Sequence, residues 1–272
     1  MSPARRRPLD RVLVERGYAT DLDAARQLVA AGRVLVDGAP TFSTARAVGA
    51  DEQVLLVEER RLVGRGGLKL AGALQRFDVD VDGGLALDVG ASTGGFTECL
   101  LASGAARVLA VDVGRGQLHE RLAADPRVVS MERTNVRDLD RPVVEGALGG
   151  PPGVVTVDMS FTSLVPHAAT LVTLAARGAA LLVLVKPQFE VDRVTASRGR
   201  GVVTDPAAWR HVLVRCASAF EAAGAGIMGA MASTILGASG NVEFFLHVEP
   251  GGRSLPGRDQ TIDDAVGEAR DR

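Results

Sequence analysis

Residues 85–96, LALDVGASTGGF, join an apolar strand-like run to a glycine-rich turn and the first residues of a helix. Gly90, Gly94 and Gly95 allow the backbone of this turn to come close to a ligand. Their spacing differs from the G-x-G-x-x-G of dinucleotide-binding folds, in which a helix N-terminus holds a pyrophosphate. Asp88 ends the strand, and its carboxylate would repel a phosphate but suits a cation. The stretch therefore predicts a turn that binds a cationic ligand without phosphate groups.

From Leu68 onward, apolar strand-like runs alternate with helical stretches. We expect seven strands, within LALDVG (85–90), RVLAVDVG (107–114), RVVSM (127–131), VVTVDMS (154–160), AALLVLVK (179–186), GIMGAMAST (226–234) and VEFFLHV (242–248). Strands separated by helices indicate a parallel α/β sheet with helices on both faces. Residues 68–250 are thus predicted to form a doubly wound, Rossmann-like domain.

Polar residues at the ends of successive strands indicate which ligand the turn binds. Asp112 ends the second strand, where a carboxylate can accept hydrogen bonds from both ribose hydroxyls. Asn135 follows the third strand, where its amide suits an adenine edge. Each residue alone is also compatible with a turn or a helix cap, but their order favours S-adenosylmethionine, which carries a sulfonium and an ammonium. The predicted cofactor contacts are Asp88, Gly90, Ala91, Ser92, Gly94, Gly95, Phe96, Asp112, Asn135, Val136 and Asp158.

Lysine is rare in this chain. Of 31 basic residues only Lys69 and Lys186 are lysines. Lys186 ends the fifth strand and Asp158 the fourth, and ligands of open parallel sheets bind outside the carboxyl ends of the strands. Lys69 lies on the expected helix before the first strand, and Glu243 opens the last strand. An amine can lose its proton where a guanidinium cannot, which favours a catalytic role over two surface residues that escaped an arginine bias.

Seven motifs, in chain order, resemble those of the TlyA-type ribosomal RNA 2′-O-methyltransferases, a family often named hemolysins, within the FtsJ-like group. They are GRGGLKL (64–70), LDVGASTGGFTE (87–98), VDVGRGQL (111–118), ERTNVRDL (132–139), VDMSFTSL (157–164), LVKPQFE (184–190) and SGNVEFF (239–245). The resemblance implies a class I methyltransferase fold and a catalytic tetrad of Lys69, Asp158, Lys186 and Glu243. It also implies methylation, without a metal, of cytidine 2′-hydroxyls in ribosomal RNA within ribosomal subunits.

Residues 1–58 are expected to form a small α+β domain with helices within 9–17 and 21–32 and strands within 33–38 and 53–57. The family begins with an RNA-binding module of the ribosomal-protein-S-four type, and these segments match its pattern. Asp21-Leu22-Asp23 replaces the usual Ser-Arg of that module, which weakens its attraction for phosphate. The predicted RNA contacts are Arg5, Arg6, Arg7, Arg11, Arg26, Arg33 and Arg65.

Residues 59–67 are predicted to be a linker and residues 251–272 a polar tail with a final helix. The chain is 46% hydrophobic with a net charge of −2, which gives no global signal for nucleic acid or membrane. Arg177-Gly178 divides the most apolar stretch, 168–185, into two halves, and neither half can span a bilayer. We therefore expect a cytoplasmic monomer with free, buried thiols at Cys99 and Cys216.

Two other classes of function are compatible with parts of this pattern. One is a non-catalytic RNA-binding ribosome factor with a relic cofactor fold, which failure to bind S-adenosylmethionine would support. The other is a membrane-active hemolysin, suggested by the family's name, which leakage of vesicles would support. The presence of all tetrad residues argues against the first, and the lack of a spanning or strongly amphipathic basic segment in the sequence argues against the second.

Overall fold

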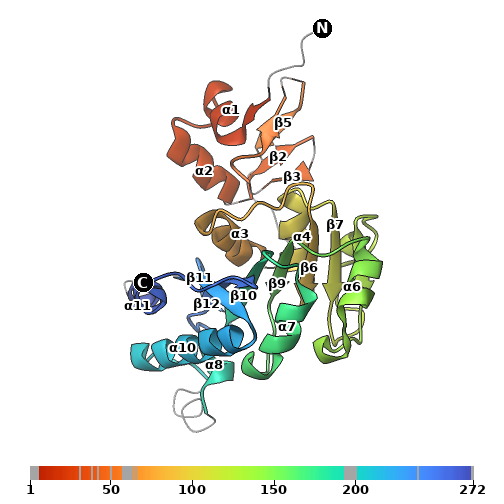
Figure 1. Ribbon diagram of the computed structural model, residues 1–272. Coiled ribbons are helices and arrows are strands. Elements are labelled where there is room, and N and C mark those ends of the chain that lie inside the picture. The colour runs from red at the N-terminus through yellow and green to blue at the C-terminus, as the bar shows by residue number, and fades with distance from the viewer. Residues whose placement is uncertain are drawn as a thin grey trace.

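The computed structural model arranges the chain in two units, a small one at the top of Figure 1 and a larger one below it. It describes residues 6–30, 32–37, 39–41, 43–49, 51–56, 64, 66–192, 201–237 and 239–270. The predicted RNA contacts Arg5 and Arg65 and most of the predicted linker, 59–67, lie outside these residues.

The larger unit is built on a seven-stranded sheet that follows the seven predicted runs. Its strands are β6 (Leu85–Val89), β7 (Arg107–Val111), β8 (Val128–Met131), β9 (Val154–Val157), β10 (Ala180–Val185), β11 (Ala225–Ala232) and β12 (Phe244–Pro250). Their order is β11-β12-β10-β9-β6-β7-β8. Strands β6 to β10 pair in parallel, and the chain winds outward in both directions from β6. The predicted doubly wound α/β architecture is confirmed for these strands.

The prediction of a parallel sheet is wrong for β12, which runs antiparallel to both β10 and β11. Only residues 233–243 separate β11 from β12. A parallel return would need a crossover of a dozen or more residues, so this short connection reverses the chain instead. In the β10–β12 register Val185 faces Phe244. The reversal therefore places the start of β12 at the carboxyl end of β10.

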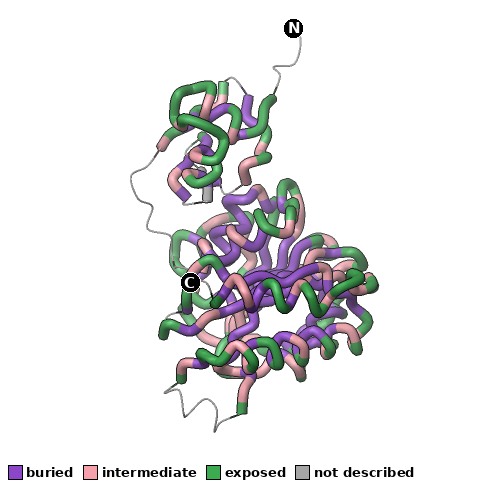
Figure 2. The backbone as a smooth tube through the Cα atoms, turned by 90° about the vertical axis from the view of Figure 1, so that its left-hand side faces the viewer, coloured by how far each residue is buried: buried purple, intermediate pink, exposed green. Residues whose placement is uncertain are grey.

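Helices cover both faces of this sheet. They are α3 (Gly66–Arg76), α4 (Gly95–Ala102), α5 (Glu120–Ala123), α6 (Arg141–Leu148), α7 (Ala168–Leu174), α8 (Pro187–Glu190), α10 (Pro206–Ala222), α11 (Arg258–Arg270) and the 3₁₀ turns η1 (Val136–Asp138) and η2 (Val165–His167). Strand side chains alternate between two cores: Leu181 and Val183 lie in one, Leu182 and Leu184 in the other. Figure 2 shows buried residues along the strands and exposed ones on the outer helical turns. Cys99 and Cys216 are free and buried, as predicted.

The small unit contains the predicted pair of helices and short strands. These are α1 (Leu9–Glu15), α2 (Leu22–Ala30), the sheet β3 (Ala39–Pro40), β2 (Val34–Val36) and β5 (Val54–Leu56), and the paired strands β1 (Arg7–Pro8) and β4 (Ala47–Val48). Its own core is formed by small and medium apolar residues such as Leu9, Leu13, Val29 and Val34. Asp21 caps α2, because its Oδ1 accepts a hydrogen bond of 2.8 Å from the Ala24 N–H.

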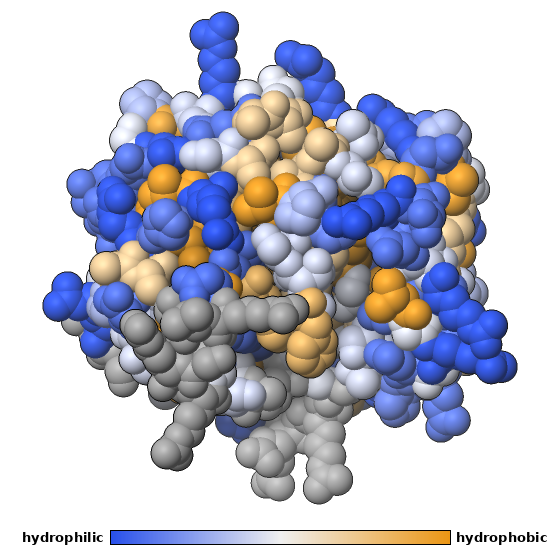
Figure 3. All heavy atoms as spheres, turned by 90° about the horizontal axis from the view of Figure 1, so that it is seen from below, coloured by the Kyte–Doolittle hydropathy of each residue, from blue (hydrophilic) through white to orange (hydrophobic). Residues whose placement is uncertain are grey.

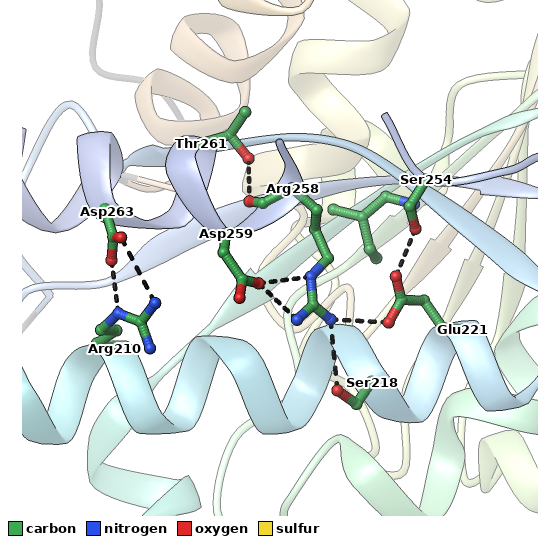
Figure 4. Close-up of polar contacts among 9 residues, drawn as sticks. Arg210, Ser218, Glu221, Ser254, Arg258, Asp259, Thr261 and Asp263 are labelled. Atoms are coloured by element: carbon green, nitrogen blue, oxygen red, sulfur yellow. Dashed lines mark hydrogen bonds and ion pairs between the residues drawn. The ribbon is translucent and has the colours of Figure 1, made fainter. Parts of the chain in front are cut away.

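The predicted final helix is present as α11, but it is part of the larger unit rather than a tail beyond residue 250. Ile262 and Val266 of α11 are buried in the same core as the sheet. Figure 4 shows the polar contacts that join it and the preceding segment to α10. In them Glu221 accepts hydrogen bonds from Arg258 (2.7 Å) and Ser254 (2.5 Å). The domain therefore extends to Arg270, since α11 covers the edge strand β11.

Ile262→Ala tests this packing. Ile262 is fully buried, and truncation of a buried isoleucine costs about 2–5 kcal/mol of unfolding free energy. The neighbouring Asp263→Ala is the control, because its ion pair with Arg210 is exposed and such pairs contribute little. Urea unfolding followed by the fluorescence of the single tryptophan, Trp209, measures both variants. Equal midpoints for the two would contradict the assignment of α11 to the core.

Candidate active site

The glycine-rich turn follows β6 and leads into α4. Gly90 has a φ of +84° and Gly94 a φ of +99°, conformations that favour glycine. A Cβ atom on Gly90 would lie 2.5 Å from the carbonyl oxygen of Asp158. The Gly90 and Ala91 N–H groups donate to the Val111 carbonyl at 2.8 and 3.1 Å, which fixes the turn against β7. The turn thus packs backbone against backbone on both sides.

Asp112 lies directly after β7 and binds the same turn. Its Oδ2 accepts a hydrogen bond from the Ser92 N–H (2.8 Å) and its Oδ1 from the Gly114 N–H (2.7 Å). Each carboxylate oxygen has a second lone pair, so the side chain can still accept ribose hydroxyls. The next residue, Val113, is 70% exposed and offers an apolar surface beside the carboxylate. Sequence reasoning missed Val113, although its position directly after an acidic strand end was a usable signal.

Asp88 lies beneath the turn rather than on its surface. Its side chain is fully buried and accepts hydrogen bonds from the hydroxyls of Thr97 (2.7 Å) and Thr156 (3.0 Å). Burial raises the pKa of Asp88 to about 7, against the opposing effect of the two hydroxyl donors. This placement ties β6 to β9 and α4, so the structure gives Asp88 an indirect role in shaping the site. Thr97 and Thr156 were not among the predicted site residues.

Other predicted cofactor contacts have different surroundings. Asn135 lies four residues beyond β8, and its side-chain oxygen caps η1 by accepting from the Arg137 N–H (3.0 Å). Val136 is buried in the main core. Phe96 is buried in the second core, where its ring lies 6.1 Å from that of Phe245.

The four residues of the predicted tetrad form two ion pairs. Lys69 Nζ of α3 lies 2.6 Å from Glu243 Oε2, and Lys186 Nζ lies 2.5 Å from Asp158 Oδ1. Lys186 follows β10, Asp158 follows β9, and Glu243 precedes the reversed strand β12. The structure therefore brings all four residues to the carboxyl ends of the parallel strands. Gly66, at the start of α3, is a neighbour of Asp158, since a Cβ there would lie 3.9 Å from its Oδ2, an ordinary van der Waals distance.

Both lysines of this site are largely buried. Lys69 and Lys186 are each 8% exposed, and burial of a charge is costly unless it is paired and hydrogen-bonded. Lys186 satisfies this requirement with Asp158 and with a hydrogen bond of 2.7 Å to the Ser160 hydroxyl. Their position at the carboxyl ends of the strands is where ligands of open α/β sheets bind.

An aromatic pair borders Lys186. The rings of Phe161 and Phe189 lie 5.0 Å apart, and Lys186 Nζ lies 6.0 Å from the Phe189 ring. Phe161 is 90% exposed and has a φ of +62°, which is strained for a bulky side chain. Sequence reasoning quoted the motifs that contain Ser160 and both phenylalanines but assigned these residues no role. A strained, exposed aromatic side chain beside buried charges is a candidate for ligand contact.

Several arginines predicted to bind RNA pair with acids of the small unit. The pairs are Arg6 with Glu52 (2.9 Å), Arg7 with Glu15 (2.6 Å), and Arg26 with Asp23 (3.3 Å) and Asp10 (3.6 Å). Arg11 is exposed and Arg33 is half-buried. Exposed ion pairs are weak, so phosphate groups can compete for these side chains.

One cleft of the structure lies away from the tetrad. A cleft of about 450 Å³ between the two units is lined by residues of 43–47 and 74–82 and by Ser103, and includes none of the tetrad. Within the described ranges, no three His, Cys, Asp or Glu residues are arranged to hold a metal, and no helix is long and apolar enough to cross a membrane. Figure 3 shows apolar side chains in small groups among hydrophilic ones on the coloured part of its face.

The fold and the site together define a Rossmann-like methyltransferase. The sequence model of the family of FtsJ-like methyltransferases matches residues 62–249, so the chain belongs to this family. TlyA-type proteins are among its relatives. It is 45% identical over 245 residues to the 16S/23S rRNA (cytidine-2′-O)-methyltransferase TlyA of Mycobacterium tuberculosis, covering 89% of this chain and 90% of that one. The resemblance inferred from the motifs is confirmed.

Proteins with hemolysin names are also similar to this chain. Hemolysin A of Brachyspira hyodysenteriae is 34% identical, over 88% of this chain and 98% of that protein. A solved structure from Streptococcus thermophilus that carries a hemolysin name superimposes with a TM-score of 0.70 at 31% identity, covering 99% and 98% of the two chains.

Asp88→Asn should alter the pH dependence of stability. The folded pKa of Asp88, about 7, lies above the value of about 4 expected in the unfolded chain, so the native state binds this proton more tightly. Protonated Asp88 therefore stabilises the folded state. This contribution to the unfolding free energy is complete below about pH 4 and is lost as the pH rises through about 7, with a slope of at most about 1.4 kcal/mol per pH unit.

Asparagine does not titrate, so the variant lacks this slope. Urea unfolding of both proteins between about pH 5 and pH 8 measures it, and the stability of the variant relative to wild type should rise with pH. The exposed Asp263→Asn is the control and should follow the wild-type profile. Parallel profiles for wild type and Asp88→Asn would contradict the assigned protonation.

Proposed function

We propose that this protein transfers a methyl group from S-adenosylmethionine to the ribose 2′-hydroxyl of cytidine in ribosomal RNA. One observation carries the proposal. At the carboxyl ends of the strands of a methyltransferase sheet, two ion pairs lie together, Lys69–Glu243 and Lys186–Asp158. The M. tuberculosis relative is named for 16S and 23S rRNA, which supports the RNA of both subunits as the substrate. We further propose that the protein acts on assembled subunits in the cytoplasm.

The residues around the turn fit S-adenosylmethionine. Strands β7 and β9 flank β6, so Asp112 and Asp158 lie on either side of the glycine turn, where carboxylates suit a ligand with positive charges. We assign the ribose hydroxyls to Asp112 and an apolar contact with the adenine to Val113. When bound, the cofactor supplies an electrophilic methyl group on a sulfonium. Asp88 supports the turn from below through Thr97 and Thr156.

Lys186 is the proposed acceptor of the 2′-hydroxyl proton. Lys186 would take up this proton as the ribose oxygen attacks the methyl group that the bound cofactor would supply. The resulting ammonium is stabilised by Asp158 and Ser160, the contacts seen in this structure. Lys69 and Glu243 hold each other in place and orient the ribose beside Lys186. General-base catalysis of this kind contributes about 10²- to 10⁴-fold.

The target nucleotide must leave its stack to reach this site. Splayed RNA bases bind on aromatic side chains, and Phe161 presents an exposed ring next to Lys186. We therefore assign Phe161, supported by Phe189, to the target base. The small unit, with Arg6, Arg7 and Arg11 among its exposed cations, is the proposed docking module of the ribosomal-protein-S-four type.

Asp112→Ala tests the cofactor site. Loss of hydrogen bonds to a charged acceptor, about 1.5–3 kcal/mol each, should weaken S-adenosylmethionine binding at least about tenfold. Asp125→Ala, which removes an acid paired with Arg127 before β8, is the control and should bind normally. Isothermal titration calorimetry measures both, and wild-type affinity of the Asp112 variant would remove Asp112 from the site.

Lys186→Arg tests the reaction itself. Arginine keeps the positive charge but stays protonated and has a planar fork, so turnover on ribosomal subunits should fall about 10²- to 10⁴-fold. Cofactor affinity should change little, and Lys69→Arg should be milder because that lysine positions the ribose. Transfer of tritiated methyl groups to subunits, with mapping of the modified 2′-hydroxyls, measures the rates. Near wild-type turnover of Lys186→Arg would defeat the assignment of the base.

A further inference from the structure

Glu190 is a buried acid that the proposed reaction does not use. It ends α8, four residues after Lys186, and its side chain is 1% exposed. An isolated buried carboxylate is costly, so its partners must satisfy both of its oxygens.

Three donors from two other segments surround this carboxylate. Oε2 accepts from the Ser163 hydroxyl (2.7 Å) and from Arg215 Nη2 (2.9 Å), and Oε1 accepts from the Leu164 N–H (2.6 Å). Arg215, on α10, also donates to the Glu190 carbonyl oxygen. The carboxylate is thus bound by a hydroxyl, a guanidinium and a backbone amide.

The segments joined in this way are the two that carry the proposed chemistry. Ser163 and Leu164 belong to the loop after β9 that holds Asp158, whereas Glu190 belongs to the turn after β10 that follows Lys186. The Lys186–Asp158 ion pair and the Phe161–Phe189 contact span the same two segments. Glu190 therefore bridges the two segments at a third point, away from the reacting groups.

We propose that Glu190 is a positioning residue that fixes the loop after β9 against the turn after β10 and so sets the geometry of Lys186 and Asp158. This inference rests on the proposed function for its catalytic consequence but not for its structural one. Glutamine at this position keeps the size of the side chain and loses one acceptor, because its amide nitrogen must face one of the three donors. The two segments should then separate and release Lys186 from its partners.

The rarity of lysine allows a direct measurement of this release. Lys69 and Lys186 are the only lysines in the chain, so trace acetylation with acetic anhydride and mass spectrometry reports each amine separately. Lys69 pairs with Glu243, outside the Glu190 contacts, and serves as the internal reference. In Glu190→Gln the Lys186-to-Lys69 labelling ratio should rise about threefold or more, because an amine freed from its ion pair reacts more readily.

The matched control is Glu221→Gln. Glu221 also accepts from a serine hydroxyl and an arginine, Ser254 and Arg258, but joins α10 to the C-terminal segment (Figure 4). This variant should keep the wild-type labelling ratio. In turnover on ribosomal subunits Glu190→Gln should fall about 10- to 100-fold with unchanged affinity for S-adenosylmethionine, since small misplacements of reacting groups have effects of this size.

A wild-type labelling ratio in Glu190→Gln would overturn the proposal. If Glu190→Gln does not fold, Ser163→Ala removes one donor and should raise the ratio in the same direction by a smaller factor, and an unchanged ratio there overturns the proposal equally. If the wild-type protein does not methylate subunits, the proposed function fails, whereas the labelling ratio still decides the role of Glu190.

Discussion

The antiparallel pairing of β12 with β10 is the constraint on which the site depends. Five successive residue pairs, from Leu181–Val248 to Val185–Phe244, hold this register. Because β12 is antiparallel to its neighbours, its N-terminal end lies beside the C-terminal end of β10. Glu243 therefore lies near Lys186 and Asp158. A parallel β12 would place Glu243 at the amino ends of the neighbouring strands instead. Strand β11 is the outermost strand on this side of the sheet, and α11 packs against it.

Buried charge is concentrated at the carboxyl ends of the parallel strands. Lys69, Lys186 and Glu243 are each less than 9% exposed, and each has a partner of opposite charge. Apolar residues of similar volume often replace such pairs without loss of stability, so the pairs are weak evidence for a structural role. Their presence at the carboxyl edge of an open α/β sheet instead agrees with a role in chemistry.

The charged side chains of the two units differ in their burial. In the larger unit the charges near the turn are enclosed and held in one geometry, as a reaction centre requires. In the small unit the arginines lie on the surface and pair with Glu15, Glu52 and Asp23, contacts that solvent and salt weaken. This difference agrees with the proposed use of the small unit to dock RNA.

The sequence by itself determined the strands and the glycine turn and predicted which residues end the strands, because hydrophobic periodicity and strand-end position are local properties of the chain. The excess of arginine over lysine marked Lys69 and Lys186 before any contact was known. Only the tertiary structure decided the direction of β12, the burial of Asp88 beneath the turn, the exposure of Phe161 and the three donors on Glu190. These features depend on hydrogen bonds and packing between residues far apart in the chain, about which local patterns carry no information.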